Sequence, residues 1–193
     1  MGNETVLYIK DHTNELSLDE LEELKNFVFD SLHSTNTEIR WLGSIEIRND
    51  GIAADYFGFW TVQTSEDTRE IVAKIVLNRS LLPTLNALKT TLAHEYGHHW
   101  TLCYLLVNQG IEPFSQRLPW QYYELRGLNQ DYAYDVKTCS ERWNECDKEI
   151  IAEDYRVLFA PNPYNQNHEM NPALDLPNPE VKNYIQNLPY LRA

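Results

Sequence analysis

Residues 90–107, TTLAHEYGHHWTLCYLLV, are a strongly apolar stretch in a chain of 193 residues. Apolar side chains recur here and just upstream at the spacing of one helix face: Leu85, Leu88, Leu92, Tyr96, Trp100 and Leu102. Pro83 suits the first turn of a helix, and Asn108-Gln109-Gly110 is a typical end. The sequence therefore predicts one long helix over about residues 83–109.

Two histidines on this helix, His94 and His98, are four residues apart. Four residues correspond to about 40° of net rotation, so both imidazoles leave the same face one turn apart. Two ring nitrogens at that spacing can bind one zinc ion, and Glu95 can accept a proton from a water beside the metal. Gly97 lowers helix propensity, which indicates close packing against this face. The spacing thus predicts a metal centre with Glu95 as general base.

The alternative is a pair of surface histidines flanking a glutamate on an amphipathic helix. The apolar surroundings of the motif favour the metal centre over that alternative. His99 points about 100° away from His98, so it cannot join the same set of ligands. We expect His99 in a supporting or a surface position.

A catalytic zinc ion usually has three protein ligands and one open position. A third histidine ten residues after the first would stand at position 104, which is Tyr104, so that arrangement is excluded. A second helix, expected over about residues 141–160, carries a row of residues on one face: Glu145, Glu149, Ala152, Glu153 and Arg156. Such a row suits one carboxylate ligand and one orienting carboxylate, or else forms a solvated acidic face. The spacing alone does not rank Glu149 above Glu153.

The remaining pattern predicts an α+β protein of one domain spanning residues 1–193. Strands are expected over 5–10, 39–48, 53–63 and 70–77, and further helices over 18–33, 120–126 and 179–188. Asn49-Asp50-Gly51 indicates a hairpin between the second and third strands. An N-terminal α/β lobe (about 1–82) then precedes the active-site helix (83–109), the glutamate helix (141–160) and a C-terminal tail and helix (161–193).

The segment between the two main helices, residues 110–138, is long and rich in aromatic residues. They are Phe114, Trp120, Tyr122, Tyr123, Tyr132 and Tyr134. A long connection inside a compact domain is often functional, although aromatic side chains also serve to cover a core. The sequence supports both interpretations equally.

The charge and hydropathy of the chain limit which partners and which cellular location we expect for the protein. The chain has 29 acidic and 16 basic residues, a net charge of −13 that disfavours nucleic-acid binding. We expect no membrane span and see no signal peptide, so the default location is the cytoplasm, with export by another route left open. Three cysteines, an odd and sparse set, do not indicate a disulfide framework, and Cys103 suits a small buried apolar position.

HEYGH at 94–98, followed about fifty residues later by EIIAEDYRVLF at 149–159, resembles the gluzincin metallopeptidases. Within them it is most similar to the lethal-factor-type catalytic domain, over roughly residues 85–159. The resemblance implies a zincin-like fold with a small mixed sheet, one Zn²⁺ ion and hydrolysis of a peptide or protein substrate. It also implies that His94, His98 and Glu149 bind zinc and that Glu153 supports a ligand histidine. Glu153 is the other candidate for the third ligand.

The chain departs from that family at one position. The family has a tyrosine, seven residues before the ligand glutamate, that assists the oxyanion, and here the residue is Arg142. Arg142 itself could stabilise negative charge. The role could instead pass to Tyr134, Tyr132 or His168, with Arg142 as a surface ion-pair partner. The departure is equally compatible with altered or absent activity.

Three functions therefore stay open. The leading expectation is a peptidase whose substrate strand adds, antiparallel, to an edge strand at residues 70–77, as this fold type suggests. The second is a catalytically silent zinc-site fold that acts as a binding or regulatory protein. The third is a zinc hydrolase that acts on a non-peptide amide.

Overall fold

The computed structural model of the protein describes residues 6–51, 55–64, 70–167 and 174–192. Its strands are β1 (Ile9–Asp11), β2 (Leu42–Arg48), β3 (Gly58–Thr64) and β4 (Ile71–Asn78). Its α-helices are α1 (Leu18–Asn26), α2 (Asn36–Ile39), α3 (Leu85–Gln109), α4 (Trp120–Arg126), α5 (Val136–Glu141), α6 (Asp147–Phe159) and α7 (Pro179–Asn187). A π-helical turn (Phe27–Ser31) extends α1, and a 3-10 turn (Trp143–Glu145) precedes α6. The expected α+β class is confirmed.

The four strands form one mixed sheet in the order β1-β2-β4-β3. β1, β2 and β4 run parallel, whereas β3 pairs antiparallel with β4. The expected hairpin between β2 and β3 is therefore wrong, because β4 lies between them. The expectation that residues 70–77 form an edge strand is also wrong, since β3 is the edge on that side. The apolar run of β4 fits its interior place, with Ala73, Ile75, Val76 and Leu77 all buried.

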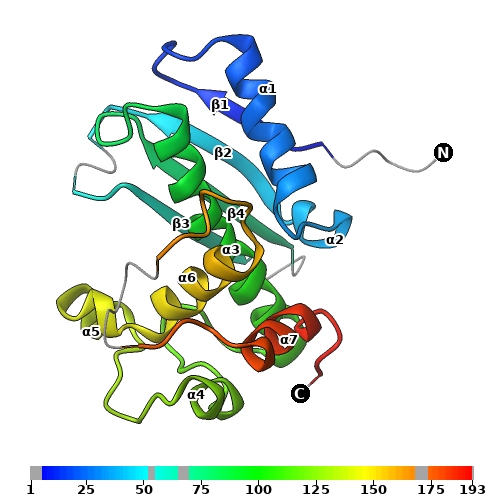
Figure 1. Ribbon diagram of the computed structural model, residues 1–193, viewed down its shortest axis with the longest axis vertical. Coiled ribbons are helices and arrows are strands. Elements are labelled where there is room, and N and C mark those ends of the chain that lie inside the picture. Colours follow the sequence, from blue (N-terminus) through cyan, green and yellow to red (C-terminus); the bar gives the residue numbers. More distant parts are fainter. Residues whose placement is uncertain (1–5, 52–54, 65–69, 168–173, 193) are drawn as a thin grey trace.

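Helix α3 runs from the sheet to the opposite end of the molecule, where α4 and α7 lie (Figure 1). Its first turn is capped by the Thr84 hydroxyl, which accepts from the Ala87 amide at 3.1 Å. Gly110, with φ of 69°, ends it in the left-handed conformation. The helix predicted over 83–109 is thus confirmed.

Helix α6 packs across α3 and is shorter than expected. It begins at Asp147, because residues 141–146 belong to the end of α5 and to the 3-10 turn. Cys139 and Cys146 form a disulfide across this turn, with a Cα–Cα distance of 4.9 Å. The odd and sparse set of cysteines did not indicate a disulfide framework, and the structure nevertheless pairs two of the three. Cys103 is free and buried, as predicted.

The aromatic connector is anchored on α6 through two buried aspartates. Asp147 accepts hydrogen bonds from the Leu118 amide and the Tyr123 hydroxyl, both at 2.9 Å, and Asp154 accepts from the Tyr122 hydroxyl at 2.7 Å. Burial and satisfied hydrogen bonds fix this segment against the helix. Part of the connector therefore covers the core, as one of the two interpretations proposed.

None of the helices within the described ranges combines the length and the apolar character needed to cross a membrane.

Candidate metal centre

His94 and His98 on α3 meet Glu149 on α6. Glu149 Oε2 lies 3.1 Å from His94 Nε2 and 3.3 Å from His98 Nε2. One ligand atom from each of the three residues lies within 4.8 Å of the others. The structure therefore brings together two residues of the motif and one glutamate from a helix more than fifty positions away.

The donor set and its spacing fit a small divalent cation. Ligand atoms about 2.0–2.1 Å from a tetrahedral zinc ion are separated by about 3.3 Å, close to the distances measured here. Two imidazole nitrogens and one carboxylate oxygen are also ligands that zinc accepts. The side chains of this cluster thus have the chemistry and the geometry to hold one ion.

Glu153 takes a supporting position beside the cluster. Its Oε2 lies 3.0 Å from His94 Nδ1, on the side of the ring away from Glu149. Arg156 donates to both Glu153 oxygens, at 2.8 and 2.6 Å, within the same buried region. A carboxylate in this position fixes the tautomer and the orientation of a ligand histidine.

Electrostatics couple these groups. Burial lowers the pKa of His94, but hydrogen bonds to Glu149 and Glu153 outweigh it and raise that pKa from 6.5 to about 10. Burial raises the pKa of Glu149, but the charge of His98 and hydrogen bonds from both histidines hold it well below its ordinary value. These contacts place His94 between the carboxylates of Glu149 and Glu153.

Glu95 lies next to the cluster on α3 and is 5% exposed. Burial raises its pKa above the ordinary value, while the charges of His98 and His94 act in the opposite direction. Its Oε2 has no hydrogen-bond partner among the residues that the structure describes. A buried carboxylate with a free oxygen is available to a bound molecule. A Cβ at Gly58 of β3 would lie 3.2 Å from Glu95 Cγ, so the edge strand passes directly over this residue.

A cavity of about 790 Å³ opens over His94, Glu95, His98 and Glu149. Large exposed apolar side chains line it: Tyr56 and Phe57 just before β3, and Phe114, Val136 and Trp143 in the segment between α3 and α6. Exposed apolar side chains grouped around one concavity indicate a binding surface.

The residues expected to assist the oxyanion occupy different places. Tyr134 lines the cavity, with the Arg117 guanidinium 4.2 Å from its ring centre and Lys148 donating to its backbone oxygen at 3.0 Å. Arg142 is exposed, pairs with Glu145 and is absent from the cavity wall, so its expected catalytic role does not fit this geometry. Tyr132 does not line the cavity either, and His168 lies outside the described residues.

Two residues beside the cluster were given too little weight on the sequence alone. His99 is fully buried rather than on the surface, and burial lowers its pKa to about 4. Trp60 of β3 lies almost parallel to the His98 ring, with an interplanar angle of 21° and ring centres 6.3 Å apart. The contact between β3 and α3 is a tertiary contact, so no local sequence pattern indicates it.

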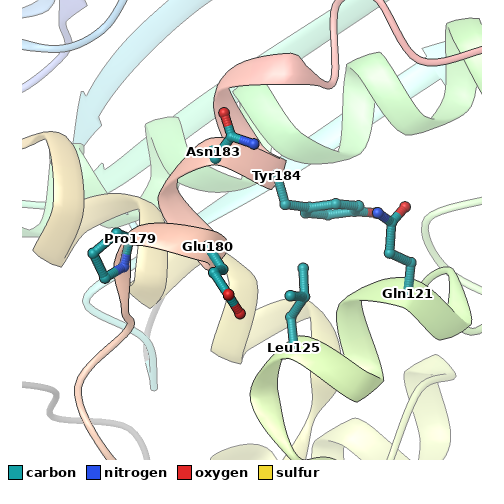
Figure 2. Close-up of a pocket in the computed structure, with 6 residues that line it drawn as sticks. All are labelled: Gln121, Leu125, Pro179, Glu180, Asn183 and Tyr184. Carbon is teal, nitrogen blue, oxygen red and sulfur yellow. The ribbon is translucent and has the colours of Figure 1, made fainter.

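A second, smaller cavity of about 280 Å³ lies between α4 and α7 (Figure 2). Gln121 and Leu125 of α4 line it together with Glu180, Asn183 and Tyr184 of α7, and the Tyr184 ring lies beside Gln121. No member of the metal-binding cluster lines it.

No family model, curated protein or solved structure matches this chain.

Proposed function

We propose that this protein is a zinc-dependent peptidase of zincin-like fold, related to the gluzincins. The observation that carries the proposal is the convergence of His94, His98 and Glu149 beside the buried carboxylate of Glu95, at the base of a large cavity. A zinc ion held by the three side chains would polarise a water molecule and the carbonyl group of a bound amide.

The roles of the protein's own residues follow from their positions. Glu95 takes a proton from the attacking water and delivers it to the departing amine, and its buried oxygen without a hydrogen-bond partner among the described residues is available for both steps. Glu153 holds the His94 ring through Nδ1. Tyr134, whose side chain lines the same cavity, donates a hydrogen bond to the developing oxyanion in place of Arg142.

The substrate backbone is proposed to run along β3. This strand is the sheet edge beside the metal-binding cluster, and residues 55–60 line the cavity. An extended peptide can add to an exposed edge through main-chain hydrogen bonds. Large apolar side chains around the cavity supply contacts for substrate side chains.

The decisive test compares wild type with Glu95→Gln. Both proteins are loaded with zinc, their metal content is measured, and both are incubated with a diverse peptide library. We expect equal zinc content and loss of cleavage in the variant, because only the proton-transfer group is removed. Undiminished cleavage by Glu95→Gln would overturn the mechanism.

The control is Glu112→Gln, the same chemical change at a residue outside the cavity wall. It should cleave like wild type. A wild-type protein that binds zinc but cleaves no peptide would instead support the silent binding protein, and cleavage restricted to other amides would support the third function.

We propose an oxidising location rather than the cytoplasm. The Cys139–Cys146 disulfide is the reason, because such bonds persist in exported proteins and are rare in the cytosol. Acid-quenched thiol counting on protein from its native source should find one free thiol, at Cys103. Three free thiols would contradict this location.

A further inference from the structure

We propose that Trp60 and His99 are positioning residues that together fix the ring of His98 for metal binding. The inference rests on the proposed metal site but not on peptide cleavage. It gives His99 a role of its own beside the two ligand histidines.

The two ligand rings are held in different ways. His94 has Glu153 at its Nδ1, the usual arrangement for a ligand histidine. The Nδ1 of His98 is buried and has no hydrogen-bond partner within the described part of the chain. Apart from the contact of its Nε2 with Glu149, this ring is therefore oriented by packing, and the aromatic ring that lies nearly parallel to it is Trp60.

Trp60 is in turn held by His99. The His99 Nε2 lies 2.9 Å from the backbone oxygen of Glu38, a contact that requires a proton on Nε2. Nδ1 is then an acceptor, and the Trp60 indole N–H donates to it at 3.4 Å. The Cys103 sulfur, 3.6 Å from the same nitrogen, is a second and weaker donor.

These contacts join three separate elements. Glu38 belongs to α2, His99 to α3 and Trp60 to the edge strand β3. His99 and Trp60 are both buried, so their contact is shielded from competition with water. The indole donates from one edge to His99 and lies with one face toward His98. Loss of either contact allows the ligand ring to rotate away from Glu149.

The first experiment compares Trp60→Leu with Trp120→Leu, a matched change at an exposed tryptophan of α4. Zinc affinity is measured by competition with a chelator, and the absorption spectrum of the Co²⁺-loaded protein reports ligand geometry. We expect about tenfold weaker zinc binding and an altered Co²⁺ spectrum for Trp60→Leu, as for loss of other groups that orient a ligand. Trp120→Leu should match wild type.

Circular dichroism and thermal unfolding of the metal-free variants separate positioning from global damage. Folded Trp60→Leu with wild-type zinc affinity and Co²⁺ spectrum would overturn the proposal. Trp60→Phe is the second variant if Trp60→Leu does not fold, because it keeps an aromatic ring and removes the indole N–H. It should show a smaller change in the same direction.

The second experiment compares His99→Asn with His99→Gln. An asparagine amide places its oxygen near the position of Nδ1, where it can accept from Trp60, whereas a glutamine amide reaches the position of Nε2 and the Glu38 oxygen. We expect His99→Asn to retain more zinc affinity than His99→Gln. Equal losses or the reverse order would show that His99 acts only through core packing.

These readouts do not depend on turnover. A wild-type protein that binds zinc without cleaving peptides removes the peptidase proposal and leaves this inference standing. A wild-type protein that binds no zinc overturns both.

Discussion

In the proposed mechanism, Tyr134 is the residue on which the chemistry of the cavity most depends after Glu95. Its ring lies beneath the Arg117 guanidinium, and Lys148 holds its backbone oxygen, so the side chain is fixed in the cavity wall. A side chain fixed in this way costs little reorganisation when its hydroxyl meets a developing negative charge. In the proposed mechanism it takes the part that the family's tyrosine, replaced here by Arg142, would have played.

Tyr134→Phe should lower kcat by about 100-fold with little change in KM, because the lost hydrogen bond forms only in the transition state. Steady-state kinetics on a cleaved peptide measure this. Tyr132→Phe is the control, since Tyr132 stays outside the cavity wall and uses its backbone oxygen to bind Arg117. Equal kinetic losses in the two variants would contradict the role of Tyr134.

Single residues also show where sequence reasoning succeeds. His94, His98 and the acidic face of the second helix follow from helical periodicity, which is a local property. The position of Arg142 does not, because it depends on where α6 begins. Because α6 begins only after the 3-10 turn and Cys146, Arg142 is not part of this helix and lies on the surface beside Glu145.

The crossing of α3 and α6 decides whether the cluster exists. A Cβ built at Gly97 would lie 2.4 Å from the backbone oxygen of Ala152 and 3.0 Å from its Cα. The obstacle is backbone, so a side chain here can be accommodated only if the two helices separate. The glycine that costs helix propensity thus brings Glu149 within reach of the histidines.

Gly97→Ala should destabilise the protein by about 1–3 kcal/mol, the usual range for overpacking, and weaken zinc binding. Chemical unfolding and chelator competition give the two quantities. Gly43→Ala is the comparison at a glycine away from this crossing: its Cβ would lie 2.9 Å from Val72 Cγ1 and 3.4 Å from the Ala73 oxygen, so it can also lower stability but should leave zinc affinity unchanged. A Gly97→Ala protein with unchanged zinc affinity would show that the helix spacing does not set the site.

Among the elements, the helices were more predictable than the sheet. The sequence predicted α3, α4 and α7 to within about two residues at each end, although it did not predict α2 or α5. Strand order could not be obtained in this way, because β2 pairs directly with β4, although β3 comes between the two in the sequence. The turn residues 49–51 indicated a reversal but not the partner of the strand that follows.

For the molecule as a whole, the coupled charges of the cluster predict a pH dependence of stability. The pKa of His94 is raised from 6.5 to about 10, so its contribution is complete below pH 6.5 and is lost as the pH rises through 10. The pKa values of Glu149 and Glu153 are lowered from 4.5, so their contribution is present above pH 4.5 and lost in acid. Metal-free protein should therefore be most stable between pH 4.5 and pH 6.5, where all three contributions are present.

Thermal unfolding from pH 4 to 10 in the presence of a chelator tests this. Zinc requires an unprotonated imidazole, so the stabilisation by added zinc should increase over the range in which the metal-free protein weakens. The variant His94→Gln should lose the decline above pH 6.5. A decline of the same size in that variant would assign it to other groups.

The disulfide between Cys139 and Cys146 has a practical consequence for handling the protein. Both cysteines border the cavity, and Cys146 immediately precedes the helix that carries Glu149. Cys103 is fully buried, and burial raises the pKa of its thiol, so it is already protected from oxidation. A thiol reductant added during purification would therefore not be needed to protect Cys103, and it would break the disulfide that borders the cavity. Expression in an oxidising compartment, followed by purification in thiol-free buffers, is the appropriate preparation.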